Sequence, residues 1–306
     1  MYAVFVVFFF KAKYGIRDLV RSRGLGDLYK RQGDAHDYHG NQRRISMGVA
    51  ILDKMETEER TSQIMTNASL LAVFAHPDDE TFRCGGTLAL LAQRGVRVQV
   101  LTATRGQAGS CGAPPLCAPE ELPAVRENEL RCACAALGIQ PPIFLDYQDS
   151  QISEADPERI VSEILAVIHE VRPKMILTYG PDGVSGHPDH IAIGRFTTEA
   201  FHRALDVVAL HAIAVPHSLA KILGMTQIHT VPDDAITLTV DVSTIWAAKM
   251  AAIHCHKTQM GESPILQASP EKQHLFLGTE HFQRILFRPD LLIKSKQSNS
   301  QQLMNF

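Results

Sequence analysis

The sequence predicts an α/β protein with a Rossmann-like, doubly wound and mostly parallel sheet that has helices on both faces. Short apolar runs alternate with longer segments of helical spacing between residues 70 and 179, and this rhythm is typical of βαβ units. Two of the apolar runs end directly in clusters of histidine and aspartate. Ligand sites of open α/β sheets lie beyond the carboxyl ends of such strands, so we expect both clusters at one edge of the sheet.

The first βαβ unit is expected from a strand at 70–75, a helix at 85–92 and a parallel strand at 96–102, joined by a right-handed crossover. Two helix and strand pairs follow, at 125–137 with 143–145 and at 157–171 with 175–179, and Pro157 suits the first turn of its helix. Residues 235–242 alternate apolar and polar, as an edge or antiparallel strand does, and 244–258 form a late helix. The Gly-, Pro-, Ala- and Cys-rich composition of residues 106–123 predicts a loop over the pocket. Residues 204–232 show no clear hydrophobic period.

The cluster at residues 76–80, directly after the first strand, can hold a metal ion. His76 and Asp79 are three residues apart, so one tight turn can point both side chains at the same ion, and Pro77 stiffens that turn. The second cluster, residues 186–190, follows the strand at 175–179 and offers His190 as a third ligand. His76, Asp79 and His190 would leave one position open, which is typical of a catalytic zinc ion rather than a structural one.

Two side chains beside these ligands have the chemistry of catalytic groups. Asp78 must point away from Asp79, so it can act as general base on the attacking water. His187 can face the substrate carbonyl and either stabilise the developing oxyanion or protonate the leaving amine. The structural alternatives are an acidic helix start at 76–80 and a polar loop at 186–190. Two such clusters, each after a buried strand, favour the catalytic interpretation.

The two clusters resemble the signature of the LmbE-like (PIG-L) family of zinc-dependent N-deacetylases, which includes the de-N-acetylases of N-acetylglucosaminyl-phosphatidylinositol and of the mycothiol and bacillithiol precursors. The motifs Ala-His-Pro-Asp-Asp-Glu and Gly-His-Pro-Asp-His-Ile stand intact at residues 75–80 and 186–191. The resemblance implies an LmbE-like fold. It assigns the metal to His76, Asp79 and His190, the base to Asp78, and the electrophilic or acid role to His187.

Weaker similarity to the family runs from residue 70 to residue 287 and implies substrate contacts. The loop at 104–109 resembles the family's Gly-rich loop, residues 126–130 its Arg-x-x-Glu-Leu element, and residues 256–259 its His-x-Ser/Thr-Gln motif. Residues 278–282 resemble Gly-x-Glu-x-Phe and, with 256–259, are expected to shape the pocket rim. An exposed, ion-paired helical arginine at 126 and a turn-forming aspartate at 146 are the structural alternatives. The substrate-binding candidates are Gln107, where the family usually has Glu, Arg126, Asp146 and His256.

The composition excludes some classes of function. The 30 basic residues are balanced by 33 acidic ones, which supports neither a nucleic-acid surface nor a polybasic membrane anchor. The six cysteines form no Cys-x-x-Cys motif, so we expect reduced thiols in a cytoplasmic protein, with a Cys111–Cys117 bridge or metal loop as the alternative. Homo-oligomer formation is compatible with the sequence. The histidines interpreted as satisfied structural residues are His211, His217 and His229.

One deacetylase domain is expected, at residues 65–290, followed by a polar tail at 291–306. Residues 1–64 are interpreted as a non-native or disordered extension, because the apolar run at 1–10 is too short to span a bilayer and residues 20–32 resemble a translated adapter sequence more than a domain. Met65 is then a natural start, with Met47 and Met55 as alternatives. A real targeting or interaction arm has weaker support, since its charged residues show no sustained period.

The residues and the resemblance together predict a hydrolase that binds one Zn²⁺ per chain, with Fe²⁺ as the alternative. Its reaction would remove an acyl group, acetyl in the family, from a small-molecule amino sugar or its conjugate. Two other functions are compatible with the same cluster: a metal-dependent amidase of a thiol-sugar S-conjugate or a non-sugar amide, and a catalytically silent metal-binding module. Metal binding alone needs neither Asp78 nor His187, and the presence of both favours an enzyme.

Overall fold

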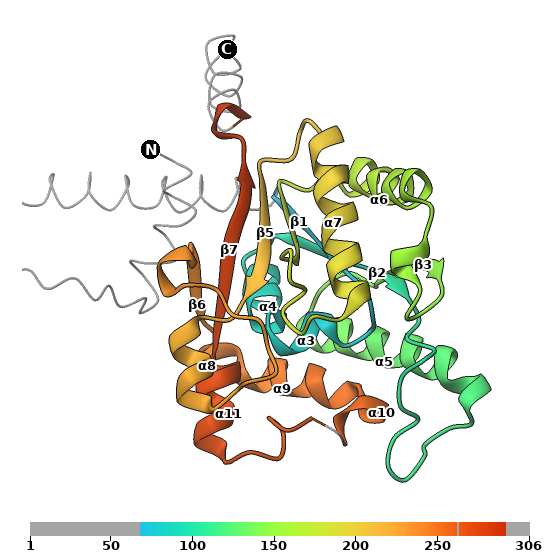
Figure 1. The fold of residues 1–306 in the computed structure, drawn as a ribbon, viewed down its shortest axis with the longest axis vertical. Helices are drawn as coiled ribbons and strands as arrows, with labels where there is room; N and C mark the ends of the chain where they lie inside the picture. The colour runs from blue at the N-terminus through green and yellow to red at the C-terminus, as the bar shows by residue number, and fades with distance from the viewer. Residues whose placement is uncertain (1–67, 262, 292–306) are drawn as a thin grey trace, which may run out of the picture.

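The structure is a computed structural model, and it describes residues 68–261 and 263–291. The predictions for residues 1–64 and for the tail after residue 291 lie outside the described residues. Seven strands form one sheet in the order β3-β2-β1-β4-β5-β7-β6 (Figure 1). Strands β1 to β5 are parallel, while β7 is antiparallel to both of its neighbours, β5 and β6. Their bounds are β1 (Ser69–Phe74), β2 (Arg97–Thr104), β3 (Ile143–Tyr147), β4 (Met175–Tyr179), β5 (Ala209–Ala214), β6 (Leu238–Asp241) and β7 (Thr279–Phe287).

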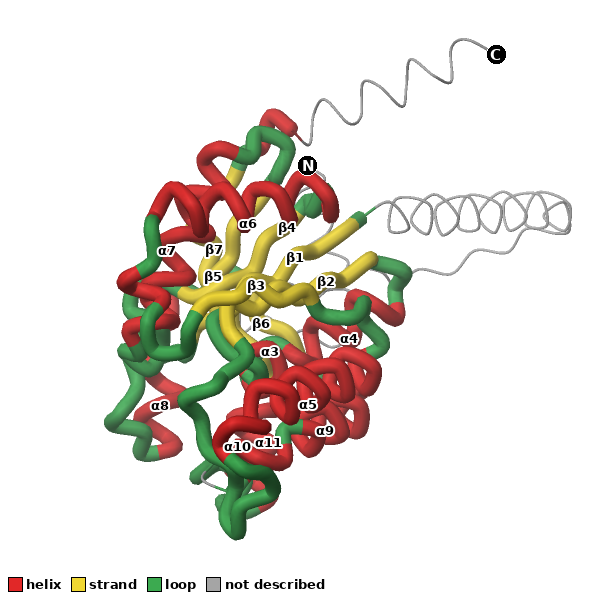
Figure 2. Tube along the Cα trace, turned by 90° about the vertical axis from the view of Figure 1, so that its right-hand side faces the viewer, coloured by secondary structure: helices red, strands yellow, loops and turns green. Residues whose placement is uncertain are grey.

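Helices cover both faces of the sheet, which confirms the predicted doubly wound fold. Helices α6 (Pro157–Val171) and α7 (Pro188–Arg203) lie on one face, and α4 (Gly85–Gln93), α5 (Leu122–Leu137) and α9 (Trp246–Cys255) lie on the other (Figure 2). The shorter helices are α3 (Asp79–Phe82), α8 (His217–Leu223), α10 (Lys257–Met260) and α11 (Pro270–Leu277). Short 3₁₀ turns occur at Pro119–Glu121, Ile152–Glu154, Asp233–Ala235 and Ser243–Ile245.

Local sequence explains the layers. Every residue of β1 is buried, as expected for an apolar run at the centre of a sheet covered on both faces. Helix α6 begins with Pro157 after a cap in which the Asp156 side chain accepts a hydrogen bond from the Glu158 amide. Its buried residues recur at helical spacing from Ile160 to Val171, so one stripe packs on the sheet while the rest of the helix faces solvent.

The structure shows how residues 204–232 and 279–287, for which the sequence predicts no strand, complete the sheet. Residues 204–232 contain β5 and α8, and residues 279–287 form β7, which the sequence marks only by the expected rim motif. Strand β5 lies between β4 and β7 and is buried on both faces, so it shows no alternation of apolar and polar residues. Strand β6 lies at one edge of the sheet and is antiparallel to its neighbour, as predicted. The helix expected at 244–258 is shorter, because it breaks at His256 between α9 and α10.

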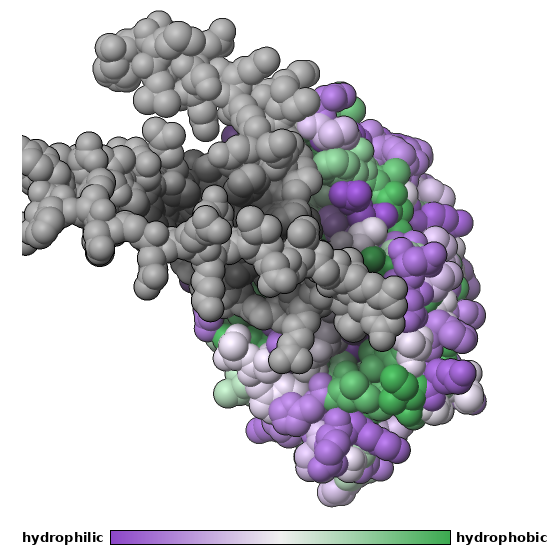
Figure 3. Space-filling model, turned by 90° about the vertical axis from the view of Figure 1, so that its left-hand side faces the viewer, coloured by the Kyte–Doolittle hydropathy of each residue, from purple (hydrophilic) through white to green (hydrophobic). Residues whose placement is uncertain are grey.

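A second, smaller core lies under the C-terminal helices. Its apolar residues come from α8, α9 and α11, with Leu219, Ile253 and Leu277 buried. The outward residues of the same helices remain exposed, namely Ile222 at 69% and Leu275 at 42%. Figure 3 shows apolar residues gathered low on the face where Figure 1 places α8 and α11, while many of the other described residues visible in that view are polar.

The expectation of reduced thiols is wrong for one pair of cysteines. Cys132 on α5 and Cys255 at the end of α9 form a disulfide with their Cα atoms 5.7 Å apart. The two residues are 123 positions apart, so no local spacing in the sequence indicates the bond; it forms because α5 packs on α9. Cys111 and Cys117, the alternative pair, are free, as are the two buried thiols Cys84 and Cys134.

Candidate active site

The two clusters meet at the carboxyl ends of β1 and β4, where the order of the strands reverses. His76 follows β1 by two residues, and Asp79 begins α3. His187 caps the start of α7, and His190 lies within its first turn. The sheet therefore brings together residues that are more than a hundred positions apart in the chain.

Close packing of α7 on β4 fixes the position of His190. Gly194 permits this packing, because a Cβ atom at that position would lie 2.6 Å from the carbonyl oxygen of Tyr179. The rings of Tyr179 and His190 stack in parallel with their centroids 4.1 Å apart. The aromatic contact leaves the His190 ring little freedom to turn away from the cluster.

Asp79 joins the two histidines that we predicted as metal ligands. Its Oδ1 lies 3.2 Å from Nε2 of His190, and its Oδ2 lies 3.9 Å from Nδ1 of His76. The amides of Ala75 and His76 donate to Oδ2, at 3.1 and 3.0 Å, and hold the carboxylate in place. His76, Asp79 and His190 thus share one small region at the sheet edge.

The other ring nitrogen of each histidine has a partner that fixes its orientation. Nε2 of His76 lies 3.0 Å from Asp149 Oδ1 and 3.2 Å from Asp189 Oδ2, and Nδ1 of His190 lies 3.2 Å from the Gly183 carbonyl oxygen. These acceptors can each take a ring proton, so the nitrogens that face Asp79 are the ones a metal would use once they lose their protons. Metal-binding histidines are held in this way by carboxylates and carbonyls behind them.

The donor chemistry of the cluster fits a divalent ion. In the described part of the chain, two groups have metal-ligand atoms within 4.8 Å of one another: His76 with His187 and His190, and His76 with Asp149 and Asp189. Imidazole and carboxylate donors suit zinc and non-haem iron. Neither group contains Asp79, which contacts both His76 and His190, so the set His76, Asp79 and His190 shares two residues with the first group and stays a prediction.

The electrostatics of the cluster favour positive charge. Burial opposes a charge on His76, but Asp149 and Asp189 outweigh it and raise its pKa from 6.5 to about 10. Burial also opposes a charge on His190, and Asp79 outweighs it, so this pKa is raised as well. Burial would raise the pKa of Asp79, yet His190 and His76 hold it well below its usual range. In the metal-free protein the histidine protons supply charge that a cation could supply instead.

Asp78 differs from its neighbour in both conformation and environment. Its backbone has φ 113°, a left-handed conformation that non-glycine residues rarely adopt. Burial raises the pKa of its carboxyl to about 6, against the charge of Arg126, whose Nη2 lies 3.3 Å from Asp78 Oδ2. The side chain keeps 25% of its surface exposed, so water can reach it.

His187 is held as a neutral donor. Its Nδ1 accepts a hydrogen bond from the Asp189 amide at 3.1 Å and so caps α7. Burial lowers its pKa, and the nearby His76 and His190 lower it further. With Nδ1 used as an acceptor, the proton of the neutral ring is on Nε2, where it can be donated.

Arg126 and Gln107, two of the substrate candidates, bind the protein itself. Arg126 is 3% exposed, so the exposed-helix alternative is wrong; its guanidinium donates to the carbonyl oxygens of Pro77 and Gly106. Gly106 cannot carry a side chain, since a Cβ would lie 2.1 Å from Arg126 Nη1. Gln107 Oε1 accepts from the Arg105 amide at 3.1 Å, within the same loop. Arg126 thus supports Asp78 and its loop, whereas Gln107 supports the loop that carries Gly106.

The structure does not bring Asp146 to the cluster. Its side chain is 82% exposed and pairs with Arg105, whereas Asp149, three residues later, is 6% exposed and contacts His76. The two motifs expected at the pocket rim each contain a completely buried side chain, His256 in one and Glu280 in the other, so neither of these two residues is a rim residue. His256 pairs with Glu80, and the carboxylate of Glu280 binds Lys249 and the start of α4.

Sequence reasoning missed the carboxylates behind His76. Asp149 follows β3 just as His76 follows β1, so its place after a strand is a signal that could have identified it. Asp189 stands inside the second cluster and is completely buried; it accepts from the amides of Ser150 and Ile152 at 2.7 and 3.0 Å. It thereby ties the β3 loop to α7 and to His76.

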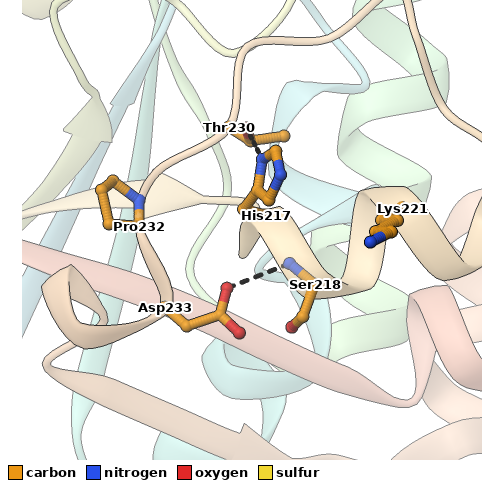
Figure 4. A pocket seen from close by; sticks show the side chains of 6 residues that line it. All are labelled: His217, Ser218, Lys221, Thr230, Pro232 and Asp233. Atoms are coloured by element: carbon orange, nitrogen blue, oxygen red, sulfur yellow. Dashed lines mark hydrogen bonds between the residues drawn. The ribbon is translucent and has the colours of Figure 1, made fainter.

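A separate surface pocket lies beside α8. Its volume is about 620 Å³, and the close-up in Figure 4 shows the Ser218 amide bonded to Asp233 and the His217 ring next to Thr230. None of the candidate ligands lines it. Of the histidines interpreted as satisfied, His217 has this partner, whereas Nδ1 of His211 is buried without a hydrogen-bond partner in the described residues. The six lining residues are His217, Ser218, Lys221, Thr230, Pro232 and Asp233.

The fold and the site define an α/β protein with a histidine and carboxylate centre at the switch point of its sheet, and comparison with known proteins identifies its class. Residues 71–201 match the PIG-L family, described as GlcNAc-PI de-N-acetylase. The chain belongs to this family of LmbE-like deacetylases, hydrolases that act on amides. No helix among the described residues is both long and apolar enough to cross a membrane.

A curated relative agrees with this assignment, and two solved structures share the fold. The 1D-myo-inositol 2-acetamido-2-deoxy-alpha-D-glucopyranoside deacetylase of Acidothermus cellulolyticus is 33% identical over 255 residues, which cover 70% of this chain and 87% of the relative. The N,N'-diacetylchitobiose deacetylase of Pyrococcus horikoshii shares the fold with a TM-score of 0.55 at 17% identity, over 76% of this chain and 92% of that one. A 4-carboxy-2-hydroxymuconate hydratase of Pseudomonas putida also shares the fold, with a TM-score of 0.54 at 21% identity. The match covers 72% of this chain and 97% of the hydratase. The fold alone therefore does not fix the reaction.

Proposed function

We propose that this protein is a zinc-dependent N-deacetylase that removes the acetyl group from an N-acetylglucosamine-type amino sugar or its conjugate. The observation that carries the proposal is the convergence of His76, Asp79 and His190 with the proton-transfer groups Asp78 and His187 at one sheet edge. The named substrates of its relatives, which are acetamido sugars, support the substrate class.

One Zn²⁺ per chain, or Fe²⁺ in its place, would be held by His76, Asp79 and His190. When bound, the ion would supply Lewis-acid polarisation of the scissile carbonyl. The protein orients the ligands in advance, because Asp149 and Asp189 hold the His76 ring from behind and the Gly183 carbonyl holds His190.

The residues of the chain divide the proton transfers. Asp78, with a pKa of about 6, is ionised at neutral pH and can take a proton from the attacking water. The neutral His187 ring can donate from Nε2 to the oxygen on which negative charge develops. The leaving amine then takes a proton from the acid form of Asp78 or from His187. Arg126 holds the Asp78 carboxylate in place during both steps.

The test is acetate release from a panel of N-acetylglucosaminyl compounds, with chelator-treated protein and after addition of Zn²⁺ or Fe²⁺. We expect acetate only in the presence of metal, and at least about a hundredfold slower release from the Asp78→Asn variant. Cleavage of a thiol-sugar S-conjugate or of a non-sugar amide, with no acetylated sugar accepted, would assign the chain to a different amidase. Metal binding without hydrolysis of any compound would leave the silent module as the function.

A further inference from the structure

Asp78 is kept in its left-handed conformation by contacts on both sides of its backbone. Such a conformation costs on the order of 1–3 kcal/mol in a non-glycine residue, so it persists only where the surroundings hold it. Thr81 donates to the Asp78 carbonyl oxygen from its amide at 3.0 Å and from Oγ1 at 2.8 Å. The Asp78 amide in turn donates to Oε2 of Glu80 at 3.0 Å.

Glu80 connects this amide to a buried histidine far along the chain. Its Oε1 lies 2.7 Å from Nε2 of His256, and the two side chains are 1% and 0% exposed. Nδ1 of His256 is buried without a hydrogen-bond partner in the described residues, so the contact with Glu80 is the one hydrogen bond that the described residues offer the ring. One carboxylate thus uses one oxygen on the backbone of Asp78 and the other on His256.

The backbone that carries His256 is held in place by its neighbours in the chain. The residue lies at the break between α9 and α10, directly after the Cys255 disulfide to α5. Two residues later, Thr258 donates to Glu129 of α5 from its amide at 2.8 Å and from its hydroxyl at 2.7 Å. His256 therefore cannot shift without breaking contacts to α5, and its position is transmitted to Glu80.

We propose that Glu80 and His256 are positioning residues that hold the backbone of Asp78 so that its carboxylate faces the attacking water. The proposal rests on the proposed function, in which Asp78 is the base. Glu80 contacts the Asp78 amide rather than its carboxylate, so it affects the position of the base and not its chemistry. His256, the residue that the sequence marks as a substrate contact, acts through Glu80 and touches no substrate.

The first test is the kinetics of Glu80→Ala and His256→Leu in the full chain loaded with Zn²⁺. We expect kcat to fall by about tenfold to a hundredfold, since a misplacement of about 1 Å can cost that much, while KM stays within about threefold and metal content stays at the wild-type value. His256→Gln keeps an N–H near the position of Nε2 and should recover most of kcat. Glu80→Gln should also recover much of it, because its amide oxygen can still accept from Asp78.

A double-mutant cycle with Asp78→Asn separates positioning from general destabilisation. If Glu80 acts through the base, Glu80→Ala should lower kcat little further once Asp78 is Asn. Glu280→Ala is the matched control, because it removes a buried carboxylate that binds a cation and two amides, Gly86 and Thr87, without contacting Asp78. Its effect on melting temperature should equal or exceed that of Glu80→Ala, with kcat per folded molecule unchanged.

The outcomes that would overturn the proposal differ from those that would overturn the function. Loss of metal in Glu80→Ala, a kcat within threefold of wild type, or an equal loss in the Asp78→Asn background would each show that Glu80 does not position the base. If Glu80→Ala does not fold, the contrast between His256→Gln and His256→Leu decides in the same way. Full turnover of the Asp78→Asn single variant would instead overturn the role of Asp78 itself.

Discussion

Two adjacent carboxylates in this protein have opposite electrostatic environments. Burial raises the pKa of Asp78 to about 6, and Arg126 opposes the shift without cancelling it. Asp79 is also buried, but His190 and His76 face it and hold its pKa low. Neighbouring acids whose pKa values are driven apart in this way are typical of sites where one group binds charge and the other moves protons.

The first residue-scale prediction separates these two roles. Asp78→Asn should keep the fold and the metal but lose at least about a hundredfold in kcat, because general-base catalysis typically contributes that factor. The amide is isosteric and can still accept from Arg126, so positioning should change little. Steady-state kinetics with metal analysis would check this. Turnover near the wild-type value would mean that another group activates the water.

The second residue-scale prediction concerns metal content. Purified protein should carry about one divalent ion per chain, and Asp79→Ala or His190→Ala should abolish its binding, since each removes one of three protein ligands. Elemental analysis after gel filtration measures the stoichiometry. Asp146→Ala is the control, because the exposed Asp146 side chain pairs with Arg105 outside the cluster. Unchanged metal in both ligand variants would contradict the assignment.

Residues in contiguous motifs could be predicted from the sequence, and residues that act across the fold could not. His76 and His190 stand in clusters whose chemistry is visible directly. Asp149 approaches His76 because β3 ends at the same sheet edge, and its place after that strand is a signal too weak to assign it a role, since no motif surrounds it. The contact between Glu80 and His256 joins residues 176 positions apart, so no spacing reveals it.

At the scale of elements, the strands that carry the site are those with the clearest sequence signal. Strands β1 and β4 are short apolar runs followed by polar clusters, and both were predictable. Strand β5 reads Ala-Leu-His-Ala-Ile-Ala, in which small residues and a histidine obscure the pattern. It becomes a strand because β4 and β7 supply its hydrogen-bond partners on both sides, which is a tertiary effect.

The element-scale prediction tests the tie between α5 and α9. Replacing both Cys132 and Cys255 by alanine should lower the free energy of unfolding by about 2–4 kcal/mol, because the disulfide closes a long loop in the unfolded chain. Urea denaturation with and without a reducing agent measures the change. Reduced wild type should match the variant, whereas a Cys111→Ser, Cys117→Ser variant should respond to reduction as wild type does. Equal stability of oxidised and reduced wild type would contradict the bond.

At the scale of the whole molecule, histidines in the cluster and in the sheet respond to acid in opposite directions. The carboxylates around His76 outweigh its burial and raise its pKa, so this residue favours the folded protein when protonated. His211 lies on β5 between Leu177 of β4 and Arg284 of β7. Burial and the charge of Arg284 lower its pKa to about 4. The sheet therefore contains a buried group that resists protonation.

The last prediction follows from this difference. Between pH 6.5 and pH 4 the unfolded chain binds a proton at His211 and the folded chain does not, so His211 lowers the stability of the wild type as the pH falls through this window. His211→Leu removes that contribution, which is at most about 3 kcal/mol for a shift of this size. The difference in free energy of unfolding between His211→Leu and wild type should therefore move in favour of the variant on going from pH 7 to pH 4. Denaturation curves at several pH values measure it, and substitution of the exposed His202 controls for the loss of a histidine. A difference that stays constant with pH would show that His211 is protonated equally in the folded and unfolded chains.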